Sequence, residues 1–169
     1  MSNSLLNEHE TMLNVGLGAT ALYAYTEAFE TVRPRAEAAV SMWHIATVLP
    51  LIFNEVSRRA IIKRRIGSGL RSILTRDPDN DIAQNEPIFN INRRLKDNYA
   101  RSMRSLNCAI AWRLLAIENG AILAVSVPKP PSFSGETLLV VNAAKKLGVW
   151  SGEMTAFEYL TVLGVEFSQ

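Results

Sequence analysis

Two glycines near the start of the sequence, in Gly16-Leu17-Gly18-Ala19-Thr20, invite comparison with a phosphate-binding loop. A P-loop places a lysine directly before its hydroxyl residue and follows a β-strand. Here Ala19 precedes Thr20, and the preceding residues 7–14 are largely polar. We therefore predict no nucleotide site at this motif and expect the glycines to allow close packing where the first helix begins.

Metal-binding residue types occur, but not at the spacing of a metal site. His9 and His44 have no ligand partner at a suitable distance along the chain, and His44 lies in an apolar segment typical of a core histidine. Asp77, Asp79 and Asp81 alternate like the start of a calcium loop. The glycine at the sixth position and the glutamate at the twelfth, which such a loop needs, are missing. The sequence predicts a turn here and no metal site.

The sequence also lacks the motifs of common catalytic sites. The single thiol, Cys108, lies in an apolar stretch and is predicted to pack as a small apolar group. There is no Gly-x-Ser-x-Gly motif and no evident pair of carboxylates for acid–base catalysis. We therefore expect no catalytic residues and no cofactor, and predict that the protein is not an enzyme.

Basic side chains are concentrated in one part of the chain. Twelve of the 18 Lys and Arg residues lie between residues 58 and 104. Residues 58–76 contain seven basic side chains and no acidic one. Such a cluster can neutralise DNA phosphates without reading sequence. A solvated face, or a docking surface for an acidic protein, has the same pattern. The residues predicted to contact DNA or an acidic partner are Arg58, Arg59, Lys63, Arg64, Arg65, Arg71, Arg76, Arg93 and Arg94.

Composition sets the broad class of the protein. The chain has 169 residues, of which 48% are hydrophobic, and a formal net charge of +2. These values fit a single globular domain over residues 1–169, with residues 1–13 as a flexible lead. One cysteine excludes an internal disulfide framework and a multi-thiolate metal site.

The most apolar window, residues 36–53, contains Glu37, His44 and Pro50 and is shorter than the ~20 residues that a membrane span needs. The N-terminus has no basic region followed by an apolar run, so it does not resemble a signal peptide. We expect a cytoplasmic protein with no membrane partner.

Hydrophobic periodicity predicts helices over the first half of the chain. Apolar residues from Gly18 to Val32 recur every three or four positions, which is the pattern of one helix face. Ala36 to Phe53 is apolar on nearly all sides, which predicts a buried helix that Pro50 kinks or ends. Asn54 is a candidate N-cap for a basic helix through Arg65, and a further short helix is predicted from Gly69 to Thr75.

The second half combines helices with one strand. Three-to-four spacing continues from Ile88 to Ile117, which predicts a long helix stopped by Gly120. The β-branched run from Ile122 to Val127 predicts a strand. Helices are then predicted from Leu138 to Leu147 and from Thr155 to Leu163.

The predicted fold is therefore mainly α, a compact helical domain with a small late β element. Tyr99 to Val127, a helix followed by a strand and a projecting loop, is similar to a winged-helix arrangement, and residues 84–169 would form that half. In the last helix the spacing places Phe157, Leu160 and Leu163 inward.

Several packing motifs, taken in order, resemble one family. They are Asn14-Val15-Gly16-Leu17-Gly18-Ala19, Val48-Leu49-Pro50-Leu51-Ile52-Phe53, Ser57-Arg58-Arg59-Ala60-Ile61 before Ser68-Gly69-Leu70, Glu118-Asn119-Gly120-Ala121-Ile122-Leu123, Ala143-Ala144-Lys145-Lys146-Leu147-Gly148-Val149-Trp150, and Leu163-Gly164-Val165. Together they resemble the middle component of three-component ABC systems, the small accessory subunit of Lamassu-type antiphage defence. The resemblance spans about residues 14 to 165.

The resemblance implies a non-enzymatic subunit that acts beside an SMC- or Rad50-like ABC ATPase and an effector nuclease. The subunit would bridge the two, and double-stranded DNA is a further expected partner. An alternative is a free-standing winged-helix-like DNA-binding regulator. On the first hypothesis, the apolar residues expected at the protein interface are Leu49, Leu51, Phe53, Phe157 and Leu160.

Overall fold

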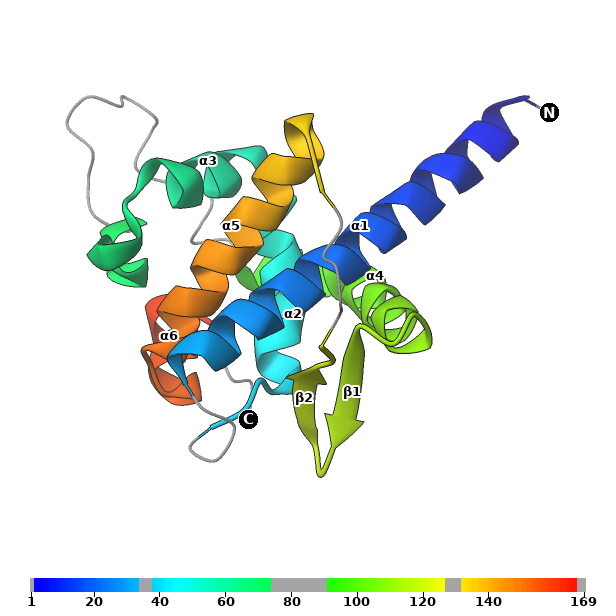
Figure 1. Cartoon of the computed structure of the whole chain (residues 1–169). Coiled ribbons are helices and arrows are strands. Elements are labelled where there is room, and N and C mark those ends of the chain that lie inside the picture. Colours follow the sequence, from blue (N-terminus) through cyan, green and yellow to red (C-terminus); the bar gives the residue numbers. More distant parts are fainter. Residues whose placement is uncertain (1, 34–37, 74–90, 127–131, 167–169) are drawn as a thin grey trace.

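The structure is a computed structural model that describes residues 2–33, 38–73, 91–126 and 132–166, with side chains from residue 15 onward. It is mainly helical with a small two-stranded sheet late in the chain, which confirms the predicted fold class (Figure 1). The elements are α1 (Ser2–Val32), α2 (Met42–Ile52), α3 (Glu55–Lys63), the 3₁₀ turns η1 (Ile66–Ser68) and η2 (Leu70–Ile73), α4 (Ile91–Ala111), β1 (Leu115–Glu118), β2 (Ala121–Ala124), α5 (Gly135–Gly152) and α6 (Ala156–Val162).

Helix α1 is the element around which the others pack, and α5 and α4 are its main neighbours (Figure 1). Two glycines of α5 allow its backbone to approach α1 closely. A methyl group at Gly148 would overlap the carbonyl oxygen of Tyr25, and one at Gly152 would lie 3.1 Å from that of Phe29. From the first contact to the second, the residue number rises by four on each helix, from Gly148 to Gly152 and from Tyr25 to Phe29. The helices α1 and α5 therefore run in the same direction.

Helix α1 begins at Ser2, so the lead predicted for residues 1–13 is helical from that residue onward. Residues 2–14 contain leucine, glutamate and methionine, which favour a helix, and contain neither glycine nor proline. In Figure 1 this part of α1 extends away from the other helices.

Helix α2 lies in the centre of the core, and its residues from His44 to Ile52 are all buried. It begins at Met42, later than the predicted Ala36, because Val40 instead accepts a hydrogen bond from the backbone N–H of Ile122 at 2.9 Å. Pro50 does not end the helix, which continues to Ile52.

The hairpin of β1 and β2 corrects the prediction of one helix from Ile88 to Ile117. Helix α4 ends at Ala111, and Leu115–Glu118 pairs antiparallel with Ala121–Ala124. Asn119 and Gly120 link the strands with positive φ angles of 51° and 80°. An Asn-Gly pair between apolar runs is a strong signal for this kind of two-residue turn. Gly120 therefore turns a hairpin rather than stopping a helix.

Helix α6 lies within the predicted range and begins with a capping box. Thr155 accepts a hydrogen bond from the Glu158 backbone at 3.2 Å, and the Glu158 carboxylate accepts one from the Thr155 backbone at 2.8 Å. Leu160 and Leu163 face inward as predicted, but Phe157 faces outward and is 70% exposed. The helix predicted from Leu138 to Leu147 is confirmed within the longer α5.

One hydrophobic cluster contains residues from all six helices and both strands. Its largest fully buried side chains include Trp150, Tyr25, Tyr159 and Phe29. Among the described residues, no helix combines the length and apolarity that crossing a membrane requires. The turn predicted at residues 77–81 lies outside the described residues.

Candidate nucleic-acid and protein interfaces

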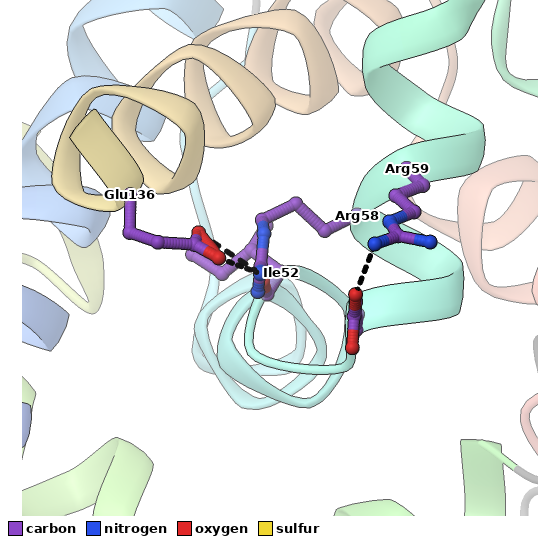
Figure 2. A network of polar contacts seen from close by, with 5 residues as sticks. Ile52, Arg58, Arg59 and Glu136 are labelled. Carbon is purple, nitrogen blue, oxygen red and sulfur yellow. Dashed lines mark hydrogen bonds and ion pairs between the residues drawn. The ribbon is translucent and has the colours of Figure 1, made fainter.

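Arg58 on α3 has internal partners (Figure 2). Its Nη1 donates a 3.0 Å hydrogen bond to the carbonyl oxygen of Ile52 at the end of α2. Its Nη2 lies 3.2 Å from the carboxylate of Glu136 in the first turn of α5. The Arg58 side chain is only 12% exposed, whereas Glu136 is 74% exposed. Arg58 thus joins three helices, although the sequence predicted it to face DNA or an acidic partner.

The other basic residues of α3 lie nearer the surface. Arg59 is exposed and forms an ion pair with Glu55 one turn earlier at 2.5 Å (Figure 2). Lys63 and Arg65 are exposed, and Arg64 is half-buried. The Arg59 pair is solvated and of the i,i+4 kind, which contributes little to stability.

Lys146 of α5 caps the end of α3. Its Nζ donates hydrogen bonds of 2.8 Å to the carbonyl of Ile62 and 2.6 Å to that of Arg64. The Trp150 indole N–H donates to the Ile66 carbonyl at 2.5 Å. Helix ends leave carbonyl groups without intrahelical partners, so these donors complete the junction of α3 with α5. Burial lowers the pKa of Lys146 below its ordinary value.

A shallow groove of about 340 Å³ follows this junction. Its walls are mostly apolar, and two lysines and one asparagine contribute polar groups. The lining residues are Ile62, Ile66, Asn142, Lys145, Lys146 and Val149.

The basic residues of α4 are divided between an inner and an outer face. Arg94 faces inward and donates to the Ser57 hydroxyl at 3.1 Å. Arg93 faces outward, 3.9 Å from Asp97. The Arg101 guanidinium lies 5.8 Å from the centre of the Phe53 ring, within the range of a cation–π contact. Lys96 and Arg104 are also exposed. Both belong to the basic cluster of residues 58–104 but not to the nine residues predicted to contact DNA.

The nine predicted DNA-contact residues therefore do not form one uniform surface. Arg58 and Arg94 have partners inside the fold, Arg59, Lys63, Arg65, Arg71 and Arg93 are exposed, and Arg64 is half-buried. Arg76 lies outside the described residues.

Most of the five residues predicted to lie at a protein interface are not exposed. Leu49, Leu51 and Leu160 lie in the core, because the faces of α2 and α6 that carry them are covered by the other helices. Phe53 is half-buried next to Arg101. Phe157 alone among the five presents most of its side chain to solvent.

Exposed apolar side chains that the sequence analysis did not single out add to Phe157. Trp112 follows α4 and is 56% exposed, with one edge of its ring against Gly16. Periodicity could not reveal this, because a tryptophan on a helical pattern is most often buried. Among the residues whose side chains the structure describes, the large exposed apolar ones are Val32, Met42, Trp43, Ile66, Tyr99, Trp112, Ile117, Val125, Leu138, Leu139 and Phe157.

A buried group of polar side chains lies between α1, α2, α5 and α6. The Ser151 hydroxyl donates to Tyr25 at 2.7 Å, and Thr47 and Tyr159 share a hydrogen bond of 2.8 Å. Burial raises the pKa of both tyrosines. Their hydroxyls are therefore neutral near pH 7, and each contributes to packing between helices.

His44 borders this group, as the core histidine that the sequence predicted. Its ring stacks on Tyr159 with centroids 5.1 Å apart, and its Nδ1 accepts a 3.1 Å hydrogen bond from the Ser41 backbone. Burial lowers the pKa of His44 from 6.5 to about 4. Among the described residues, no three His, Cys, Asp or Glu side chains are placed to hold a metal ion.

A comparison with protein-family models gives one match over nearly the whole chain. Residues 2–167 match the family described as ABC-three component (ABC-3C) system Middle Component 3. The chain belongs to this family. The resemblance to the middle component of three-component ABC systems is thereby confirmed. Neither the curated proteins nor the solved structures contain a match to the chain.

Proposed function

We propose that the protein is a non-enzymatic accessory subunit of a Lamassu-type antiphage complex, in which it bridges an SMC- or Rad50-like ABC ATPase and an effector nuclease. The observation that carries this proposal is the family match over residues 2–167. A middle component by definition functions with other components, so its surface should be specialised for partners. Cytoplasmic location and a contact with DNA belong to the same proposal.

The exposed apolar residues support a role in assembly. Phe157 on α6, Trp43 on α2 and Trp112 after α4 each expose more than half of an aromatic side chain. Aromatic residues are enriched at protein interfaces, where they account for much of the binding free energy. A subunit with such residues on several elements can contact more than one partner.

The experiment is a pull-down of a tagged full-length chain from its native host, with mass spectrometry of the recovered proteins. We expect recovery of a large coiled-coil ABC ATPase together with a second, effector protein. Recovery of neither component would contradict the proposal.

A pair of variants makes the pull-down residue-specific. Phe157→Ser removes the most exposed large apolar side chain, and Tyr99→Ser removes a comparably exposed aromatic from α4. Loss of a central aromatic contact costs more than 2 kcal/mol, or roughly 30-fold in affinity. We expect Phe157→Ser to reduce recovery of one partner and Tyr99→Ser to leave it unchanged. Recovery of both partners by Phe157→Ser at the level of the unaltered protein would exclude Phe157 from the interface.

A second candidate function is a free-standing DNA-binding regulator. The observation that favours it is the order of α4 and the β1–β2 hairpin, since a helix followed by a hairpin is the arrangement of a winged-helix module. This candidate requires sequence-selective binding by the isolated protein, because base-edge contacts discriminate between sequences and phosphate contacts do not. Equal affinity for unrelated duplexes would exclude it.

A further inference from the structure

We infer that the outer face of α4 is the surface that binds the backbone of double-stranded DNA, and that Arg58 and Arg59 of α3 are not part of it. The binding residues are Arg93, Lys96, Arg101 and Arg104, here called the α4 strip. This inference names the surface that makes the DNA contact of the proposed function. It rests on the proposed function only in assuming that the protein contacts DNA.

The first argument is that the α4 strip is solvent-facing and that α4, all of whose residues the structure describes, contains a single carboxylate. All four side chains are exposed, and Asp97 is the only carboxylate in α4. Asp97 lies 3.9 Å from Arg93. Three positive charges of the strip therefore remain after this pair is counted, and one of them, Arg101, also lies 5.8 Å from the centre of the Phe53 ring.

The second argument is the spacing of the strip along the helix. Arg93 and Arg104 are eleven residues apart, which is close to three turns, so they share a side and are separated by about 16 Å along the axis. Lys96 and Arg104 are about 12 Å apart on the same basis. The major groove of B-DNA is about 12 Å wide. Lys96 and Arg104 can therefore reach phosphates on the two edges of one groove.

The third argument distinguishes DNA from an acidic protein. The exposed residues between and beyond the cations include Ala100, Asn107 and Ala111, which are small or polar. A protein interface has a core enriched in aromatic residues and depleted in lysine. Tyr99 is the one large apolar side chain that α4 exposes, so within α4 the strip has a single aromatic anchor beside its four cations.

Arg58 and Arg59 of α3 lack the first of these properties. Arg58 is held by Ile52 and Glu136, and Arg59 is paired with Glu55 at 2.5 Å. A phosphate would have to compete with these two carboxylates for the guanidinium groups of Arg58 and Arg59.

The experiment compares two double variants of the full-length chain with equal loss of charge. Lys96→Gln/Arg104→Gln removes two charges from the α4 strip, and Arg59→Gln/Arg65→Gln removes two from the α3 region. All four residues are exposed, and glutamine favours helix formation nearly as well as lysine and arginine do, so both proteins should fold. Affinity for two unrelated DNA duplexes is measured by fluorescence anisotropy at several salt concentrations.

We expect the α4 variant to bind both duplexes roughly tenfold or more weakly at low salt, with the slope of log K against log salt reduced by about two. We expect the α3 variant to change affinity by less than about threefold, because solvated charges away from the contact act only through a screened field. An equal loss of DNA affinity in both variants would show that affinity depends only on the net charge of the protein. That result would overturn the inference. Absence of duplex binding by the unaltered protein would overturn it as well.

The same variants separate this inference from the proposed function. In the pull-down, the α4 variant should recover the ABC ATPase and effector as the unaltered protein does. If it loses a protein partner while its DNA affinity is unchanged, the α4 strip is a protein interface and the inference is wrong, whereas the bridging role stands. If neither the unaltered protein nor the α4 variant recovers a partner, but the α4 variant binds DNA more weakly than the unaltered protein, the bridging role fails and the inference stands.

Discussion

Helices α3 and α4 look alike in the sequence, since each is short of acidic residues and rich in arginine, but the structure uses them differently. On α3, Arg58 ties the end of α2 to the start of α5. On α4, Lys96, Arg101 and Arg104 face solvent. A cluster of positive charge in a sequence therefore does not reveal whether its members stabilise the fold or are available to a partner.

The difference follows from what surrounds each helix. Helix α3 is nine residues long and lies between the end of α2 and α5, so its side chains meet backbone carbonyls and a carboxylate. Helix α4 has 21 residues and a wholly apolar or small buried face, which leaves the opposite side for charge. The interior also differs from place to place: Ser151 and Thr47 are hydrogen-bonded to buried tyrosines, whereas the hydroxyls of Ser102 and Ser105 on the buried face of α4 have no hydrogen-bond partner among the residues that the structure describes.

The largest expected effect is a loss of unfolding free energy at low pH, which arises from the buried His44. Its pKa is about 4 in the folded protein and 6.5 when unperturbed. Because the folded-state pKa is depressed, the unfolded chain binds the proton first as pH falls, and stability is lost between pH 6.5 and 4. The full loss is about 3 kcal/mol. Urea denaturation at a series of pH values should show it.

The matching variant is His44→Phe, which cannot titrate. We expect it to be less stable at pH 7, since it loses the hydrogen bond from Ser41, but to lose less stability on acidification. A variant whose stability falls with pH as steeply as that of the unaltered protein would assign the pH dependence to other groups.

The next effect tests the structural role of Arg58. Arg58→Ala leaves the Ile52 carbonyl and the Glu136 carboxylate without this donor. We expect a loss of about 2 kcal/mol of unfolding free energy, measured by urea denaturation, because hydrogen bonds from charged groups contribute about that much. Arg59→Ala, which removes a solvated pair, should cost less than about 0.5 kcal/mol. Equal losses would abolish the distinction between the two neighbours.

A smaller effect is expected at the junction of α3 with α5. Lys146→Met keeps the length of the side chain but removes the donor to the Ile62 and Arg64 carbonyls, which should cost about 1 kcal/mol. Lys145→Met, at the exposed neighbouring position, is the control and should change stability little. Indistinguishable melting curves for Lys146→Met and the unaltered protein would mean that water satisfies these carbonyls equally well.

The smallest effect on stability belongs to the α4 strip. Lys96→Gln/Arg104→Gln should change the unfolding free energy by less than about 0.5 kcal/mol, because surface substitutions without specific partners rarely do more. Denaturation curves of this variant and of the unaltered protein should coincide within that limit. A loss comparable to that of Arg58→Ala would show that α4 and α3 are used alike.

Local signals in the sequence determined much of the element pattern. Periodicity located the helices at Gly18–Val32 and Leu138–Leu147, and Asn54 caps α3 as predicted by accepting from the Ser57 backbone at 3.0 Å. The ordered packing motifs were enough to identify the family. These features follow from spacing, capping chemistry and side-chain size, which a chain carries wherever it folds.

Tertiary structure decided which faces are inside. The sequence could not show that Leu49 and Leu51 are covered while Phe157 is exposed, because each lies on an apolar helical pattern. It could not separate Arg58 from Arg59, because the carboxylate that distinguishes them, Glu136, is 78 residues away. It likewise gave no reason to pair Val40 with Ile122 across the fold. Spacing determines which residues share a face of a helix, but burial and pairing depend on which other segment packs against that face, and that is a property of the folded chain.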